Sequence, residues 1–405
     1  MALEKGELMK ILYIDVNCKS GSTGKIVYDL YKELRSEGQE AAICYGRGSI
    51  VDEPDIFRFS GKFEVYFHAL MTRITGLTGC FSPFATRRLL KFIQSYQPDV
   101  VHIHELHGYF VNIKPVMNYL KKNKIRTVWT FHCEFMYTGR CGYAYECEKW
   151  KSGCGECPNI KEYPSSLFFD RSPKMFKDKV KLFDGFDCLT ITAPSEWLAK
   201  RIRESFLSDK DIRVVHNGID TTEVFNAERN DFLKQKHNII NEKIVIAVAP
   251  GLMQERKGGK WVVELAEKMK DDKIKFIMIG VDETETKFGD NIIALGRTEN
   301  QKELAQYYEL ADLCLLTSFR ETFSLVCVES LASGTPIAGF KAGAPETIVP
   351  PKLGKFVDYG DIESLRICVT KMLKEEKPLL ECRDYAVKHF DKYIMFKSYK
   401  EIYMQ

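Results

Sequence analysis

Short apolar runs alternate with longer amphipathic stretches along the chain, and this alternation restarts once. Runs that are apolar throughout are typical of parallel strands buried on both faces. The alternation predicts an α/β fold built from doubly wound sheets. Strands are expected at Ile11–Val16, Ala41–Tyr45, Val100–His104, Thr127–Phe131, Leu189–Ala193, Val214–His216, Ile244–Ala249, Phe276–Ile279, Ile292–Leu295, Leu313–Thr317 and Pro336–Ala338, and helices at Lys25–Ser36, Lys260–Lys270 and Gln301–Leu310.

The restart falls at residues 214–220, which read Val-Val-His-Asn-Gly-Ile-Asp. Asn-Gly is a turn signal suited to a hinge, and 405 residues exceed the usual size of one domain. We therefore predict two Rossmann-like domains facing each other across a cleft, with ligands at the carboxyl ends of the strands. The expected parts are domain 1–213 with a cysteine-rich insert at 133–160, domain 214–384, and a helix over 385–405 that returns to the first domain.

Composition narrows the class of protein. The formal net charge is only +3, so no overall positive field indicates nucleic-acid binding. No apolar run reaches the roughly 20 residues that a membrane-spanning helix needs. Residues 1–10 contain Glu4 and Glu7 and lack the apolar core of a secretory signal. We expect a cytoplasmic protein.

Two glutamates eight positions apart carry the first chemical signal. Leu313–Thr317 is expected to be a buried strand, and Ser324 is a good N-cap for a helix that ends at Gly334. Glu321 then lies in the strand-to-helix turn and Glu329 about one turn inside the helix. The free N–H groups of such a helix start bind phosphate, while the two carboxylates can bind sugar and ribose hydroxyls. In the alternative, Glu321 only caps the helix and Glu329 is solvated.

Two further loops follow predicted strands of the second domain. Arg256 and Lys257 come shortly after Ile244–Ala249, and cations there can balance the charge on a departing diphosphate. The alternative is a solvated basic loop. Residues 339–348 place a glycine-bearing turn after the next strand. The alternative is an ordinary loop that connects this strand to the following helix.

In the first domain, residues 19–25 read Lys-Ser-Gly-Ser-Thr-Gly-Lys and follow a predicted strand. A P-loop is excluded, because its first glycine would fall at Lys19. We expect the loop to contact an anion or a sugar, with a plain turn as the alternative. His132 ends the strand Thr127–Phe131, where it can hydrogen-bond a sugar or serve a structural role.

Together these elements resemble family 4 of the retaining glycosyltransferases, which have the GT-B fold. They run in family order over nearly the whole chain. The matching parts are Glu321 and Glu329, Arg256-Lys257-Gly258, residues 215–220, Leu295-Gly296-Arg297, Gly339–Glu346 and the early glycine-rich loop.

The resemblance implies a role for each part. Glu321 would bind hydroxyls of the transferred sugar and Glu329 the ribose, while Lys257 and Arg256 would hold the diphosphate. Family members often carry Gly-Arg where this chain has Gly251-Leu252, so the arginine role would pass to Arg256. The remaining implied contacts are the amides of Phe323, Ser324 and Leu325 with the diphosphate, Gly296 and Arg297 with the base, His132 with the sugar near the reacting carbon, and Gly21, Ser22 and Gly24 with phosphate and acceptor.

The implied reaction moves a hexose-type sugar from a nucleotide-diphosphate-sugar to a glycan or polyprenyl-linked acceptor. It proceeds by front-face displacement with no catalytic metal and no enzyme nucleophile. The chain is similar to the bacterial subset that builds exopolysaccharide or O-antigen, of the colanic-acid type. The alternatives are a GT-B-fold epimerase or phosphorylase and a non-catalytic nucleotide- or glycan-binding module.

Four cysteines gather within the insert, at Cys141, Cys147, Cys154 and Cys157. Four thiols with one C-x2-C spacing suit a tetrahedral structural zinc. Disulfides are the second interpretation, since a reducing compartment disfavours them. His102, His104 and His107 are not expected to bind metal, because alternation along a strand explains the first two.

Residues 63–84 are rich in aromatic side chains, and Arg73, Arg87, Arg88 and Lys91 lie nearby. Basic and aromatic residues together can mark a helix that lies on a membrane. The alternative is a pair of ordinary core helices. A membrane helix would make the protein peripheral at the inner membrane face, acting on a polyprenyl-linked glycan.

Overall fold

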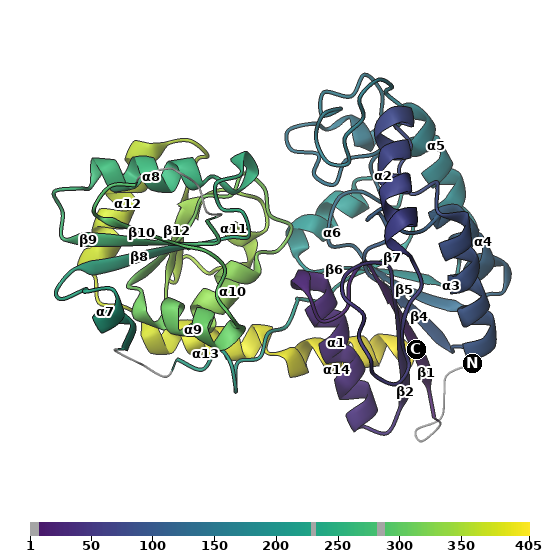
Figure 1. Cartoon of the computed structure of the whole chain (residues 1–405), viewed down its shortest axis with the longest axis horizontal. Helices are drawn as coiled ribbons and strands as arrows, with labels where there is room; N and C mark the ends of the chain where they lie inside the picture. The colour runs from purple at the N-terminus through teal and green to yellow at the C-terminus, as the bar shows by residue number, and fades with distance from the viewer. Residues whose placement is uncertain (1–7, 228–231, 282–287) are drawn as a thin grey trace. The chain divides into compact units, whose positions relative to one another are not determined.

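The computed structural model describes residues 8–227, 232–281 and 288–405. The expectation about a secretory signal rests on residues 1–10 and lies largely outside this part. The chain divides into two compact units (Figure 1), one ending at Val215 and completed by Phe396–Gln405, the other formed by His216–Met395. The sequence placed this division after residue 213.

The first unit contains a seven-stranded sheet in the order β3-β2-β1-β4-β5-β6-β7, with every pairing parallel. The order reverses between β1 and β4, where a doubly wound sheet has its topological switch point. The strands are β1 (Lys10–Asp15), β2 (Glu40–Tyr45), β3 (Ile56–Arg58), β4 (Val100–Ile103), β5 (Arg126–Thr130), β6 (Leu189–Ala193) and β7 (Asp211–Val214); the helices are α1 (Gly21–Ser36), α2 (Lys62–Thr75), α3 (Pro83–Tyr96), α4 (Ile113–Lys122), α5 (Ser172–Phe183) and α6 (Glu196–Arg203).

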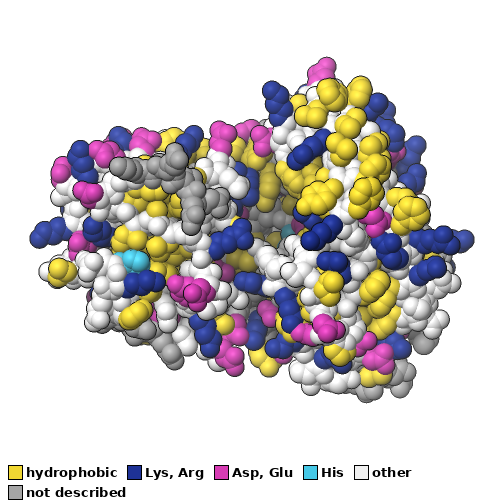
Figure 2. Space-filling model, in the orientation of Figure 1, with side chains coloured by type: hydrophobic (Ala, Val, Ile, Leu, Met, Phe, Trp, Pro, Cys, Tyr) yellow, Lys and Arg dark blue, Asp and Glu magenta, His cyan; other side chains and the backbone are white. Residues whose placement is uncertain are grey.

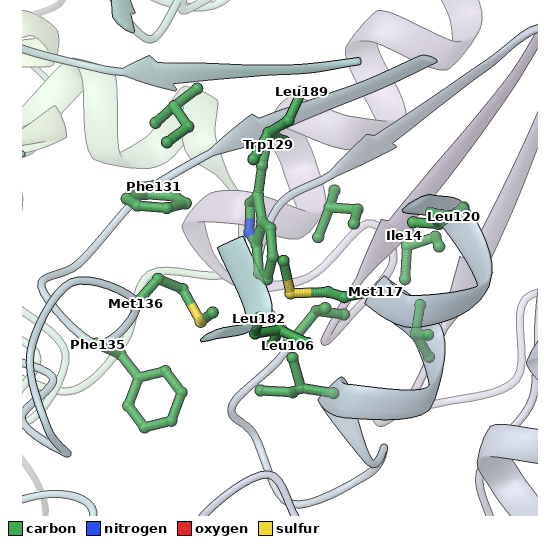
Figure 3. Packing of buried hydrophobic residues seen from close by; sticks show 14 of the residues in the cluster. Ile14, Leu106, Met117, Leu120, Trp129, Phe131, Phe135, Met136, Leu182 and Leu189 are labelled. Carbon is green, nitrogen blue, oxygen red and sulfur yellow. The ribbon is translucent and has the colours of Figure 1, made fainter. Parts of the chain in front are cut away.

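The core of this unit lies between the sheet and its helices. Figure 3 shows Trp129 of β5 beside Met117 of α4 and Leu182 of α5. The indole N–H of Trp129 donates to the carbonyl of His104, 3.0 Å away, so its polar atom is satisfied inside the core. This packing fixes the ends of β4 and β5, where His104 and His132 follow.

The second unit contains a six-stranded parallel sheet in the order β10-β9-β8-β11-β12-β13, which switches direction between β8 and β11. The α/β fold predicted from the sequence is thus confirmed. Its strands are β8 (Lys243–Val248), β9 (Ile274–Ile279), β10 (Ile292–Leu295), β11 (Leu313–Leu316), β12 (Ile337–Phe340) and β13 (Gly354–Val357); its helices are α7 (Phe232–Lys236), α8 (Gly259–Lys268), α9 (Gln301–Leu310), α10 (Leu325–Ala332), α11 (Pro345–Ile348), α12 (Ile362–Lys374) and α13 (Leu379–Phe390).

Two expectations about the elements are corrected. The strand expected at Val214–His216 to open the second domain is β7, Asp211–Val214, and it closes the first sheet instead. The single helix expected over 385–405 is two helices, α13 and α14 (Lys392–Tyr403), which break at Asp391. At the break, Ile219 exchanges backbone hydrogen bonds with Phe390 and Lys392.

The aromatic stretch does not form a pair of ordinary core helices. The large apolar side chains of α2 point outward, with Phe63 81% and Tyr66 73% exposed. Figure 2 shows hydrophobic side chains gathered on this face of the first unit, with Lys and Arg side chains nearby. Among the described residues, no helix combines the length and apolar character that crossing a membrane would require.

Candidate active site

Two loops meet at the switch point of the second sheet. One follows β8 and contains the short 3-10 helix Glu255–Lys257, and the other follows β11. The amide of Phe319 donates to the carbonyl of Arg256 at 2.9 Å, and the Thr317 hydroxyl donates to the carbonyl of Lys257 at 3.0 Å. These backbone contacts fix the position of Lys257 relative to the end of β11.

Gly258 makes this close approach possible. Its φ of 73° lies in the left-handed region, and a Cβ atom built there would sit 2.2 Å from the carbonyl oxygen of Thr317. Any other residue would therefore add both backbone strain and a clash with the facing loop. The fold therefore requires glycine at the third position of the Arg256-Lys257-Gly258 element.

Lys257 and Glu321 form an ion pair at this point. The Nζ atom of Lys257 lies 2.7 Å from Oε1 of Glu321, and the two side chains are 15% and 14% exposed. Burial alone would raise the pKa of Glu321, but the charge and hydrogen bond of Lys257 hold it below its ordinary value. Glu321 is therefore ionised at neutral pH and able to accept hydrogen bonds.

A third loop, after β12, fixes the backbone of Glu321. The Glu321 amide donates to the carbonyl of Ala342 at 2.9 Å, and the amide of Ala344 donates to the Glu321 carbonyl at 3.1 Å. Between them, the amide of Gly343 donates to both carboxylate oxygens of Glu346. The turn at 339–346 is thus part of the same constellation and more than a connection between elements.

Helix α10 carries the second glutamate of the E-x7-E element. Ser324 is its N-cap, as predicted, and its hydroxyl accepts from the amide of Cys327 at 3.4 Å. Glu329 is buried, and Tyr308 of α9 donates to its Oε2 at 3.3 Å. The alternative of a solvated Glu329 and a merely capping Glu321 is wrong, because Glu329 is buried and Glu321 pairs with Lys257.

The other residues of this unit that the sequence predicted for the site lie on several different loops around Lys257 and Glu321. Arg256 precedes Lys257 and is partly buried, while Phe323 is buried next to His216 and Phe390. Gly296 and Arg297 are exposed and follow β10, which β9 separates from β8.

In the first unit, the glycine-rich loop opens helix α1. The helix begins at Gly21, and Gly24 packs against the backbone of Asn17, where a Cβ atom would come within 3.1 Å. Gly21 and Ser22 remain exposed. This arrangement leaves the outer part of the loop open to a ligand.

Asp15 lies at the end of β1 beside this loop, and sequence reasoning missed it. Thr23 donates to its Oδ2 at 2.9 Å and the amide of Glu105 to its Oδ1 at 3.1 Å. Burial raises the pKa of Asp15 to about 7. The position of Asp15 in an apolar strand could have marked it as a functional residue. Its contact with Glu105, however, follows only from the pairing of β1 with β4.

His132 follows β5 and His104 follows β4, so the two imidazoles meet at the carboxyl edge of the first sheet. Nδ1 of His104 lies 2.9 Å from Nε2 of His132, so one ring nitrogen donates to the other. Burial lowers the pKa of His132 to about 4, which leaves the ring neutral at pH 7. His102 lies deeper and contacts the hydroxyls of Tyr403 and Thr130 at 2.6 and 2.7 Å.

His107 departs from the strand pattern. In the part of the chain that the structure describes, one group of three potential metal ligands brings its ligand atoms within 4.8 Å of one another, and it consists of Glu105, His107 and Cys133. The sequence predicted no metal at His107, and it did not identify Glu105 or Cys133 as its neighbours.

The cysteine-rich insert is fixed to the first unit by a buried carboxylate. Glu134 accepts from Arg201 at 2.7 Å, from Tyr137 at 2.6 Å and from the amide of Ala144 at 2.6 Å. The four cysteines line one small cavity. As a group, their sulfur atoms lie farther apart than the ligand atoms of Glu105, His107 and Cys133. Buried Arg140 also lines this cavity, and its Nε has no hydrogen-bond partner among the described residues.

Comparisons with known proteins relate both halves of the chain to glycosyltransferases. Residues 23–223 match the model of Glycosyltransferase Family 4, and residues 229–389 match that of Glycosyl transferases group 1. The chain is 26% identical over 377 residues to the putative colanic acid biosynthesis glycosyl transferase WcaC of Escherichia coli K12, covering 88% of this chain and 89% of the relative. It is 27% identical over 198 residues to the N-acetyl-alpha-D-glucosaminyl L-malate synthase of Bacillus anthracis, covering 46% and 51%.

Solved structures show the same fold at low sequence identity. Sucrose-phosphate synthase from Thermosynechococcus elongatus superposes with a TM-score of 0.71 at 15% identity, covering 98% of each chain. Anabaena HepE in complex with UDP and glucose gives a TM-score of 0.65 at 15% identity, covering 97% of this chain and 99% of that one.

Proposed function

Because the chain belongs to the family 4 glycosyltransferases, we propose that it moves a hexose-type sugar from a nucleoside-diphosphate sugar to a glycan or polyprenyl-linked glycan with retention of configuration. The pair of Lys257 and Glu321 at the switch point of the second sheet carries the donor half of this proposal. Doubly wound sheets bind ligands at that edge. The similarity to a colanic acid enzyme supports a surface polysaccharide as the product, and UDP bound to HepE supports a nucleotide donor.

The donor's pyrophosphate competes with Glu321 for Lys257 in this account. Lys257 and Arg256 bind the diphosphate together with the amides of Phe323, Ser324 and Leu325 at the start of α10, where the helix dipole favours an anion. Glu321 is then released to accept hydrogen bonds from hydroxyls of the sugar. Positive side chains and the helix start balance the charge that develops on the leaving diphosphate.

We propose the remaining substrate contacts from the positions of the residues in the two sheets. Glu329, already paired with Tyr308, accepts from the ribose hydroxyls, and Gly296 and Arg297 lie toward the base. In the first unit, neutral His132 binds a sugar hydroxyl. Gly21, Ser22 and Gly24 bind phosphate or acceptor groups at the start of α1.

Replacing Glu321 with glutamine tests the enzymatic proposal. We expect Glu321→Gln to lower sugar transfer by roughly 100-fold or more, about 2.7 kcal/mol. The affinity for the nucleoside diphosphate should not fall, and should rise to the extent that Glu321 competes for Lys257. The control is Glu363→Gln, because Glu363 is an exposed ion-pair partner of Lys268 in the same unit. Unchanged transfer in Glu321→Gln, or no transfer by the wild-type protein with any donor, would contradict the proposal.

We also propose that Cys141, Cys147, Cys154 and Cys157 bind a structural zinc. Four thiols around one cavity match its preferred ligands, and the amide of Gly139 already donates to the Cys154 sulfur at 3.1 Å. Buried Arg140 and Lys179 lie near the sulfurs and would balance the negative charge of four thiolates. A closed four-sulfur site stabilises the insert and leaves no position for catalysis.

Metal analysis tests this second proposal. The purified wild-type protein should contain zinc, and chelation should lower the melting temperature of the first unit. Cys154→Ser should lose that metal, whereas Cys368→Ser in the second unit should keep it. Equal zinc content in the two variants would exclude the insert as the site.

Finally, we propose that α2 lies on the inner face of the cytoplasmic membrane. Phe63, Tyr66, Phe67, Leu70 and Ile74 share one exposed face of this helix. Apolar and aromatic side chains near cations insert into anionic lipid surfaces. Phe63→Asp should reduce sedimentation with anionic vesicles, while Ile240→Asp, an exposed site of the second unit, should not. Equal sedimentation of both variants would contradict a membrane role for α2.

A further inference from the structure

Three side chains that no part of the proposed transfer reaction uses meet at the carboxyl edge of the first sheet. Glu105 and His107 lie on the loop after β4, and Cys133 lies shortly after the neighbouring strand β5. Nδ1 of His107 is 2.7 Å from Oε2 of Glu105, and Nε2 of His107 is 3.7 Å from the sulfur of Cys133. The ligand atoms of all three side chains lie within 4.8 Å of one another.

The separation between Nε2 of His107 and the sulfur of Cys133 is close to that of two ligands around one ion. Zinc binds sulfur at about 2.3 Å and imidazole nitrogen at about 2.0–2.1 Å, so a tetrahedral ion holds the two ligands about 3.5 Å apart. The observed distance of 3.7 Å between Nε2 and sulfur requires almost no movement. The donor set of thiolate, imidazole and carboxylate is one that zinc accepts.

The surroundings restrict how these side chains can move. The His107 ring stacks on Phe135 with centroids 4.9 Å apart and contacts Tyr163 at 5.7 Å. His107 is buried, and the side chain of Glu105 is only 14% exposed. The position of the His107 ring is thus fixed before any ion binds, which reduces the entropy that binding would otherwise cost. Glu105 contacts Nδ1 of that ring and must turn a carboxylate oxygen toward an ion bound at Nε2.

We propose that Glu105, His107 and Cys133 form a second metal site, separate from the four-cysteine cavity, that binds a zinc-class divalent ion. Binding releases the thiol proton of Cys133, because the thiolate is the ligand. Three protein ligands leave a fourth position for water or another oxygen donor, unlike a closed four-sulfur site. The ion ties the loop after β4 to the segment after β5.

Cobalt and zinc titrations of the full-length protein test the site. Wild-type protein saturated with zinc and dialysed should retain one equivalent more than Cys133→Ser. With Co²⁺, the wild type should show a thiolate-to-metal absorption band that Cys133→Ser reduces. Cys80→Ser is the control, because Cys80 is an exposed free thiol of the same unit and should leave both readouts unchanged.

The comparison does not depend on the insert, because any metal bound by its four cysteines is present in all three proteins. Glu105→Gln provides a second variant that retains the volume of the side chain and should weaken zinc binding at this site by at least tenfold. If Cys133→Ser fails to fold, Glu105→Gln decides the question. Equal metal content and equal zinc affinity in the wild type and the folded variants would overturn the proposal.

Discussion

Among single residues, the proposed donor site depends on a charged pair that the backbone positions before any ligand binds. Lys257 and Glu321 are each fixed by hydrogen bonds of neighbouring loops and then contact one another at 2.7 Å. The two largely buried charges stabilise each other, and Lys257 holds the pKa of Glu321 below its ordinary value. A diphosphate can therefore replace the carboxylate as the partner of Lys257 without creating an unpaired buried cation.

Gly258 provides a prediction at this scale. Gly258→Ala should destabilise the second unit by about 2 kcal/mol and weaken nucleotide binding, because its Cβ atom would push the carbonyl of Thr317 away. Gly360→Ala is a matched control, since Gly360 has a similar φ of 86° but its nearest neighbour would lie at 3.8 Å. Thermal melting and nucleotide titration measure both effects. Equal behaviour of the two variants would contradict the steric argument.

Much of this candidate site could be predicted from the sequence, because its residues lie next to strands and helices that short stretches of sequence reveal. Lys257, Glu321, Glu329 and Ser324 each follow or precede a strand or helix whose position their neighbours reveal. Asp15, Glu105 and Cys133 could not be assembled in the same way, because their proximity depends on the order of β1, β4 and β5 in the sheet. Single-sequence patterns show that a strand exists but do not determine its neighbours.

Among the elements, apolar composition determined which strands could be predicted, and even the edge strand β10 was found because all four of its residues are apolar. The central strands are buried on both faces and appear as continuous apolar runs, so β1, β8 and β11 were found. The missed strands are edge strands: β3 has three residues, and β13 carries an exposed Lys355. The polar alternation of β7, with Asp211 and Arg213, likewise hid the last strand of the first sheet.

Helix α2 provides a prediction about pH. His68 is fully buried on the inner side of α2, with Nδ1 2.9 Å from the Ser82 hydroxyl, and burial lowers its pKa to about 4. The unfolded chain takes up a proton near pH 6.5 that the folded chain resists, so stability is lost as the pH falls from 6.5 toward 4. This loss amounts to at most about 3 kcal/mol.

His68→Gln should remove part of that acid sensitivity, since glutamine can still bond Ser82 but does not titrate in this range. Urea unfolding at pH 7.0 and 4.5 measures it. The difference in unfolding free energy between the two pH values should be smaller in His68→Gln than in the wild type. An identical difference would show that His68 does not carry the effect.

At the scale of the whole molecule, the end of the chain completes the first unit. The last part of α14 belongs to that unit, where Tyr399 and Tyr403 are buried. Tyr403 contacts His102 at 2.6 Å, and Tyr399 contacts Thr130 at 2.9 Å. The sequence predicted this return, because the segment 385–405 is amphipathic, but it did not reveal the break at Asp391.

Deleting residues 396–405 should therefore destabilise the first unit by roughly 5 kcal/mol or more, since several large buried side chains are lost together. Urea titration followed by tryptophan fluorescence measures this, because Trp129, Trp150 and Trp197 belong to the first unit and Trp261 to the second. Removing only Met404 and Gln405 is the control. A first-unit transition that does not shift in the longer deletion would contradict a structural role for α14.

The proposed function requires Lys257 to bind the pyrophosphate of a nucleotide at the switch point of the second sheet. Calorimetric titration with nucleoside diphosphates tests it most directly, by comparing the wild type with Lys257→Met and Lys268→Met. We expect nucleotide binding to be at least roughly tenfold weaker in Lys257→Met, about 1.4 kcal/mol, and the Kd to be unchanged in Lys268→Met. Equal affinity of all three proteins for the nucleotide would contradict it.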